Sequence, residues 1–165
     1  MAQEAIRFCE MFLDGTQVGL EWGSGRSTLW FGERMKRLLS IEYDPLWHEK
    51  VINQIQKKGY KHIKCCLVRL EHSLEEPTKP FYDKQPAYVS IIEDFEDESL
   101  DFVVVDGHYR QACILAALPK LKSKGCLLVD NTNWLPIEEW GVPPKWLIMH
   151  QSSNVLTQTT IWQKP

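Results

Sequence analysis

The chain has 165 residues, a length typical of one domain, and we predict a single domain over residues 1–165. Hydrophobic residues make up 44% and charged residues 25%, which is the composition of a globular protein and excludes a disordered one. The net charge of −3 gives no electrostatic reason to expect a nucleic-acid or membrane partner. No apolar run is long enough for a membrane span, and residues 1–14 lack a signal-peptide core, so we expect a cytoplasmic protein.

Short apolar runs alternate with helical patterns along most of the chain. Strands are predicted over 17–21, 37–42, 62–68, 100–106 and 126–130, and helices over 28–35, 45–58, 90–95 and 110–122. The runs at 102–105 and 126–129 are continuously apolar, as is typical of parallel strands covered on both faces. Pro119 lies inside the last helix and is expected to loosen its end.

The C-terminal part of the chain has a different pattern. Residues 145–150 and 158–162 are β-rich, and only the short segment 151–157 separates them. This is too little chain for a crossover helix, so the two strands are expected to pair as a hairpin. The predicted fold class is therefore α/β, with a Rossmann-like, doubly wound, mostly parallel sheet and a C-terminal antiparallel β-hairpin.

The five cysteines are expected to be buried, reduced thiols in a reducing compartment. They are Cys9, Cys65, Cys66, Cys113 and Cys126, and no pair is spaced as Cys-x-x-Cys. None of them stands in a polar loop beside a histidine, so neither a zinc site nor a cysteine nucleophile is expected.

The segment from Glu21 to Thr28, with sequence EWGSGRST, follows the first predicted strand and precedes the first predicted helix. Gly23 and Gly25 suit a tight turn at which a nucleotide-like ligand can approach bare backbone. Glu42 ends the next apolar run about 20 residues further on, where nucleotide-binding α/β folds place a ribose-binding carboxylate. Taken alone, the glycines would equally suit a plain strand-to-helix turn.

Two long irregular segments follow the third and fifth predicted strands. Residues 69–88 and 131–144 are rich in proline and aromatic residues. Both leave the carboxyl ends of strands, where open α/β sheets bind their ligands. They are therefore predicted to form walls of a substrate site.

Four motifs in order resemble those of the class I S-adenosylmethionine-dependent methyltransferases, over nearly the whole chain. Residues 21–27 resemble the first motif of that family, 41–44 the second, 101–107 the fourth-strand motif, and 120–131 the lead into the fifth strand. The resemblance implies S-adenosylmethionine as cofactor. The residues that it implies for cofactor binding are Glu21, Gly23, Ser24, Gly25, Ser27, Thr28, Glu42, Tyr43 and Asp106.

Asp106, Asp130 and Asn131 resemble the metal triad of catechol O-methyltransferase-type enzymes. Their oxygen ligands would suit Mg²⁺ or Ca²⁺. In that family the metal lowers the pKa of a substrate hydroxyl, so the resemblance implies methyl transfer to an oxygen of a small molecule. Asp106 could instead cap a helix, and the 130–131 pair could form a plain turn.

The catalytic residues implied on the acceptor side are Asp106 and His108. The lysine that catechol O-methyltransferase-type enzymes usually carry three residues after the first Asp is Tyr109 here. His108 stands beside that position, and because histidine ordinarily titrates near neutrality it is the candidate proton acceptor. A structural or solvated histidine is the alternative.

Two other function classes fit parts of the sequence. An NAD-dependent oxidoreductase would share the glycine and acidic signals, but the terminal hairpin and the lack of a second domain argue against it. A non-catalytic binding or assembly module on the same fold is the second alternative, and the intact Gly23, Gly25, Glu42 and Asp106 argue against it. A P-loop hydrolase is excluded because no Gly-Lys-Ser/Thr follows the glycine turn. Exposed tryptophans would permit a homo-oligomer.

Overall fold

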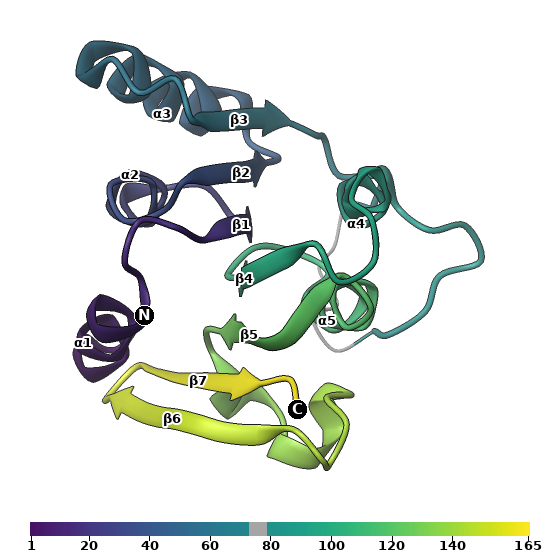
Figure 1. Cartoon of the computed structure of the whole chain (residues 1–165). Helices are drawn as coiled ribbons and strands as arrows, with labels where there is room; N and C mark the ends of the chain where they lie inside the picture. The colour runs from purple at the N-terminus through teal and green to yellow at the C-terminus, as the bar shows by residue number, and fades with distance from the viewer. Residues whose placement is uncertain (73–78) are drawn as a thin grey trace.

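The computed structural model describes residues 1–72 and 79–165 and has one seven-stranded sheet with strand order β3-β2-β1-β4-β5-β7-β6 (Figure 1). The strands are β1 Val18–Trp22, β2 Arg37–Glu42, β3 Ile63–Leu67, β4 Leu100–Val105, β5 Leu121–Val129, β6 Leu147–Asn154 and β7 Thr157–Gln163. The helices are α1 Gln3–Phe12, α2 Arg26–Gly32, α3 Pro45–Lys58, α4 Ala87–Ser90 and α5 Arg110–Ala117, with 3₁₀ turns η1 Ile91–Asp94, η2 Thr132–Trp134 and η3 Ile137–Trp140.

The first five strands are parallel, and the last two form the predicted antiparallel hairpin. β1 is central, with Leu20 opposite Leu39 of β2 on one side and Val103 of β4 on the other. From β1 the chain moves outward to β3 and then crosses back to β4, so the strand order reverses between β1 and β4. In open α/β sheets this switch point forms a ligand crevice at the carboxyl ends of the strands. The predicted fold class is confirmed.

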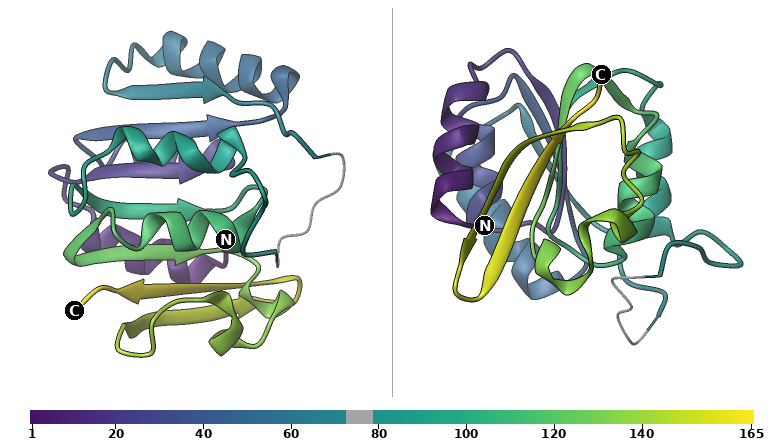
Figure 2. Two further views of the ribbon diagram at one scale, coloured as in Figure 1. Left: turned by 90° about the vertical axis from the view of Figure 1, so that its right-hand side faces the viewer. Right: turned by 90° about the horizontal axis from the view of Figure 1, so that it is seen from below.

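Helices cover both faces of the sheet (Figure 2, right). α1, α2 and α3 lie on one face and α4 and α5 on the other, so successive residues of one strand enter different cores. In β4, Val103 and Val105 pack into one core, while Phe102 and Val104 pack into the other. All four side chains are buried, which explains the continuous apolar run at 102–105.

The predicted helices over 110–122 and 90–95 differ most from the structure. The helix expected over 110–122 ends at Ala117, and β5 begins at Leu121. Pro119 has no N–H to continue a helix, and the Lys120 carbonyl pairs with the amides of Ser99 and Leu100. The helix expected over 90–95 is split into α4 and η1.

The cysteines are free thiols, and four of the five are buried. Burial raises the pKa of Cys9 and of Cys126 to about 12, which makes both thiols unreactive. Trp140 and Trp146 are also buried and cannot provide the exposed surface that we expected of the tryptophans. Among the described residues no helix could cross a membrane.

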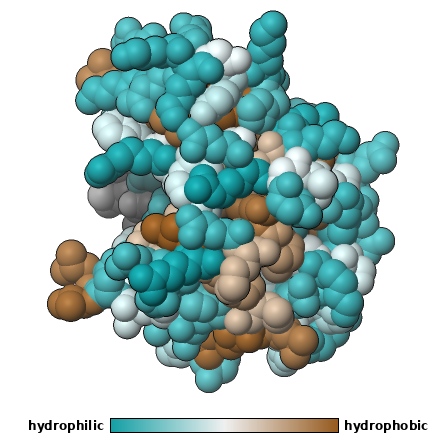
Figure 3. Space-filling model, turned by 60° about the vertical axis from the view of Figure 1, so that its left-hand side comes forward, coloured by the Kyte–Doolittle hydropathy of each residue, from teal (hydrophilic) through white to brown (hydrophobic). Residues whose placement is uncertain are grey.

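The surface over the α1–α3 side is mostly hydrophilic, with apolar patches in its lower half (Figure 3). The largest exposed apolar side chains of α1 and of the C-terminal hairpin are Met11, Leu147, Ile148, Met149, Val155 and Leu156.

Candidate functional site

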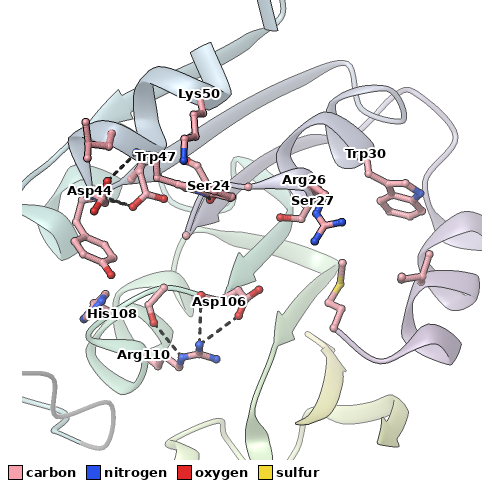
Figure 4. A pocket seen from close by; sticks show the side chains of 18 of the residues that line it. Ser24, Arg26, Ser27, Trp30, Asp44, Trp47, Lys50, Asp106, His108 and Arg110 are labelled. Atoms are coloured by element: carbon pink, nitrogen blue, oxygen red, sulfur yellow. Dashed lines mark hydrogen bonds and ion pairs between the residues drawn. The ribbon is translucent and has the colours of Figure 1, made fainter. Parts of the chain in front are cut away.

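A pocket of about 1060 Å³ opens at the carboxyl ends of β1, β2 and β4 (Figure 4). Eight of the residues predicted from the sequence line it, namely Gly23, Ser24, Gly25, Ser27, Glu42, Tyr43, Asp106 and His108. They come from three strand ends that the sheet order brings together. This volume is at the upper end of the range for small-molecule sites, which leaves room for two ligands.

The turn after β1 packs directly against the end of β4. Gly23 has φ +95°, and a Cβ at this position would lie 2.6 Å from the carbonyl oxygen of Asp106 and 2.8 Å from the nitrogen of Gly107. The Gly23 amide donates to the Ile41 carbonyl of β2 at 2.9 Å. Only glycine fits this conformation and this close approach. Through these contacts, the backbone of Gly23 connects the ends of β1, β2 and β4.

Glu21 lies behind this turn rather than in the pocket. Its carboxylate is buried and accepts hydrogen bonds from the hydroxyls of Ser27 at 2.6 Å, Thr28 at 2.6 Å and Ser40 at 2.7 Å. Burial raises the pKa of Glu21 to about 7, although these hydrogen bonds act against the rise. The Thr28 hydroxyl also accepts from the Gly25 amide at 2.8 Å. Glu21 and Thr28, both predicted to bind a cofactor, therefore hold the turn in place from behind.

Glu42 lines the pocket, and backbone amides fix the orientation of its carboxylate. Its Oε1 accepts from the amides of Tyr43 and Asp44, both at 2.9 Å. Burial raises the pKa of Glu42 in spite of these bonds. Asp44 caps α3 by accepting from the Trp47 amide at 2.7 Å, and the Trp47 indole donates to the Ser24 carbonyl at 2.6 Å. A carboxylate has about four acceptor positions, so Glu42 can still accept from ligand hydroxyls.

Arg110 connects the ends of β4 and β5, and it was not among the residues predicted from the sequence. Its guanidinium donates to the carbonyls of Gly107 at 3.0 Å and Asp130, and to the carboxylate of Asp106 at 3.2 Å. It also lies 4.7 Å from the centre of the Trp134 ring, which lines the pocket. An arginine four residues after the strand-end Asp106, in the first turn of a helix, was the available signal.

Among the described residues, nothing supports the predicted Mg²⁺ or Ca²⁺ site at Asp106, Asp130 and Asn131. One oxygen of Asp130 accepts from Thr157 at 2.9 Å and Thr159 at 2.5 Å, and the other accepts from the Met1 amino group at 2.7 Å. No group of three or more His, Cys, Asp or Glu side chains in residues 1–72 and 79–165 could hold a metal ion.

The remaining members of the predicted triad do not fit a metal either. Asp106 already faces the Arg110 cation, and a second cation beside that guanidinium would be repelled. Asn131 adopts the left-handed conformation with φ 59° and begins η2, which matches the turn alternative.

His108 lines the pocket with its ring against Tyr43, at 4.1 Å between ring centres. Burial, assisted by the positive charge of Arg110, lowers the pKa of His108 to about 4. The expectation that it titrates near neutrality is therefore wrong, and at pH 7 the imidazole is neutral and a weak base.

Of the two predicted substrate walls, the segment 131–144 contributes Trp134 to the pocket lining. In the segment 69–88, residues 73–78 lie outside the described part of the chain. The described residues of this segment do not line the pocket. Instead, His72 and Tyr82 pack against Tyr109, and the His72 amide donates to the Tyr109 hydroxyl at 3.2 Å.

No family model and no curated protein matches the sequence. Solved structures, in contrast, match it over almost its whole length. The chain has the fold of the class I S-adenosylmethionine-dependent methyltransferases.

Three of the matching structures illustrate the range of proteins with this fold. An O-methyltransferase from Bacillus cereus in complex with S-adenosylhomocysteine has a TM-score of 0.69 at 14% identity, covering 99% of this chain and 82% of its own. An RNA methyltransferase from Salinibacter ruber, also in complex with S-adenosylhomocysteine, has a TM-score of 0.63 at 14% identity, with 100% and 93% coverage. Precorrin 8W decarboxylase from Methanobacterium thermoautotrophicum has a TM-score of 0.63 at 17% identity, with 100% and 91% coverage.

Proposed function

We propose that this chain is an S-adenosylmethionine-dependent methyltransferase that transfers a methyl group to an oxygen of a small molecule. The observation that carries the proposal is the meeting of the Gly23–Gly25 turn, Glu42 and Asp106 in one pocket. The fold adds support, because solved structures that share it include complexes with S-adenosylhomocysteine.

On the cofactor side, residues of the chain bind the cofactor and fix its orientation. Gly23 and Gly25 let the ligand approach the backbone at the end of β1. Glu42, held by two backbone amides, accepts from the ribose hydroxyls. When bound, the cofactor supplies a methyl group that is already electrophilic because it is attached to a sulfonium. The chain therefore has mainly to orient the acceptor and exclude water.

On the acceptor side, Asp106 faces the reacting centre and takes the proton of the acceptor hydroxyl. Burial raises the pKa of Asp106, and the Arg110 guanidinium, which fixes the carboxylate at 3.2 Å, acts against this rise. His108 is neutral at pH 7, so it accepts or donates a hydrogen bond beside Asp106 rather than adding a charge. We place the small acceptor on the side of the pocket that Asp106 and Trp134 line.

The sheet order disfavours the NAD-dependent oxidoreductase that was the alternative. Dinucleotide-binding folds have a parallel sixth strand next to the fifth, whereas here the antiparallel β7 lies between β5 and β6. A methyltransferase pocket on this sheet needs no second domain.

The test is calorimetric titration of the protein with S-adenosylhomocysteine and, separately, with NAD⁺. We expect micromolar binding of S-adenosylhomocysteine and at least a tenfold loss of affinity in Glu42→Gln, because the neutral amide accepts less strongly from two hydroxyls. The matched control is Glu49→Gln, the same change on the exposed surface of α3. Binding of NAD⁺ alone would overturn the proposal in favour of an oxidoreductase. Binding of neither would favour a non-catalytic module.

A further inference from the structure

Every carboxylate that lines the pocket already has a donor from the protein. Glu42 accepts from the amides of Tyr43 and Asp44, and Asp44 itself accepts from the Trp47 amide. Asp106 accepts from the Arg110 guanidinium. The acidic groups of the pocket are therefore satisfied before any ligand enters.

The basic groups of the pocket are not all satisfied in this way. Arg110 is committed to Asp106 and to backbone carbonyls, and the Lys50 ammonium lies 5.2 Å from the centre of the Trp47 ring. Arg26 differs from both. In the described part of the chain, its guanidinium takes part in no hydrogen bond, ion pair or ring contact, although Arg26 lines the pocket.

The position of Arg26 directs this charge toward a ligand. It is the first residue of α2 and directly follows Gly25 of the glycine turn. Figure 4 shows its side chain directed into the pocket from α2, with Trp30 of the same helix beside it and Arg110 on the far wall. Trp30 lines this end of the pocket with apolar surface. A ligand that contacts this end meets an apolar wall and one uncommitted guanidinium.

We propose that Arg26 binds a carboxylate group of a ligand at this end of the pocket. A guanidinium presents a planar fork of donors that matches the two oxygens of a carboxylate, and such bidentate pairs are among the stronger charge-assisted hydrogen bonds. The possible sources of this carboxylate follow from the proposed function, on which this inference rests. It belongs either to the amino-acid end of the cofactor or to the methyl acceptor.

The first arm of the test separates the cofactor from the acceptor. Binding of S-adenosylhomocysteine and of 5′-methylthioadenosine, which lacks the amino-acid end, is measured by calorimetry for the wild type, Arg26→Gln and Arg26→Lys. A cofactor carboxylate predicts about a tenfold loss for S-adenosylhomocysteine in Arg26→Gln, partial recovery in Arg26→Lys, and no change for 5′-methylthioadenosine. The matched control is Arg7→Gln, an exposed arginine of α1 outside the pocket lining.

The second arm titrates benzoate and its neutral analogue benzamide into the free protein and into the protein saturated with S-adenosylhomocysteine. An acceptor carboxylate predicts that the wild type prefers benzoate and that Arg26→Gln loses the preference, while its affinity for S-adenosylhomocysteine stays unchanged. The proposal would be overturned if Arg26→Gln changed neither the affinity for S-adenosylhomocysteine relative to 5′-methylthioadenosine nor the preference for benzoate over benzamide. Because benzoate is also titrated into the free protein, failure of the wild type to bind S-adenosylhomocysteine would overturn the proposed function and leave the test of Arg26 intact. Thermal unfolding checks that each variant folds, which we expect because the Arg26 side chain is exposed.

Discussion

The two sides of the pocket satisfy their buried carboxylates in different ways. On the β1–β2 side, Glu21 accepts only from hydroxyl groups. On the β4–β5 side, Asp106 faces the Arg110 cation and Asp130 faces the Met1 amino group. Burial works against ionisation of Asp130, but hydrogen bonds from Met1 and Thr159 outweigh it and lower the pKa of this carboxyl. The first side is held by neutral donors and the second by opposite charges.

The two sides of the pocket therefore tolerate different changes. A protonated Glu21 can keep its place among hydroxyls, because hydroxyls both donate and accept hydrogen bonds. Arg110, in contrast, cannot lose its charge, so removal of either partner leaves an uncompensated charge in a largely buried place. We therefore expect the loss of one charged side chain to cost more stability on the β4–β5 side than on the β1–β2 side, and rising pH to destabilise the β1–β2 side.

The largest effect is expected for Arg110→Met, which should lower the free energy of unfolding by about 3 kcal/mol. The change leaves Asp106 without its cation and the carbonyls of Gly107 and Asp130 without their donor. Urea unfolding at pH 7 measures it. Asp106→Asn is the control, and the double variant should lose less than the sum of the two single losses because the residues interact. A loss below about 1 kcal/mol for Arg110→Met would contradict the view that the guanidinium stabilises the contact between the ends of β4 and β5.

A smaller effect is expected where the two sides touch. Gly23→Ala should lower the free energy of unfolding by about 2 kcal/mol, because the alanine would be strained at φ +95° and its Cβ would approach the backbone of Asp106. Gly59→Ala is the matched control, with φ +70° and no heavy atom within 4 Å of the added Cβ. It should cost only about 1 kcal/mol. If urea unfolding gave the same loss of free energy for both variants, the close approach of Gly23 to the end of β4 would add nothing to the cost of the alanine.

The pH dependence should distinguish the sides further. The pKa of Glu21 rises from 4.5 to about 7 on folding, so the folded protein binds this proton more tightly than the unfolded chain does. Its contribution to stability is complete below pH 4.5 and is lost as pH rises to 7, by about 3 kcal/mol. In Glu21→Gln this loss should disappear. Urea unfolding at half-unit pH steps measures it, and an unchanged pH profile would contradict the raised pKa.

His108 provides the opposite sign on the other side of the pocket. Its pKa falls from 6.5 to about 4 on folding, so its contribution is present above pH 6.5 and is lost as pH falls to 4. Relative to the wild type, His108→Gln should therefore make stability fall more steeply with rising pH, whereas Glu21→Gln should make stability rise with pH. Changes of the same sign in the two variants would contradict one of the two shifts.

The same division explains what the sequence could predict. Glu42 accepts from the amides of the next two residues in the chain, and the partners of Glu21 lie 6, 7 and 19 positions away. The parallel strands and the hairpin were likewise readable from local apolar patterns. The hydroxyls that occupy Asp130, in contrast, come from 27 and 29 positions away, across the pairing of β5 with β7. No local pattern shows that pairing register, so Asp130 could be taken for a metal ligand.

The smallest effect is expected for divalent cations, and it tests the β4–β5 side without a mutation. Because Asp130 is surrounded by donors and Asp106 faces Arg110, added Mg²⁺ or Ca²⁺ finds no free pair of carboxylates there. Millimolar EDTA, Mg²⁺ or Ca²⁺ should therefore leave unchanged the melting temperature and the affinity for S-adenosylhomocysteine. A saturable stabilisation by either ion that Asp130→Asn abolishes would show that the cation displaces these donors. In Arg110→Met the repelling charge is gone, so a newly gained response to Mg²⁺ in that variant would identify the guanidinium as what excludes the ion from the wild-type site.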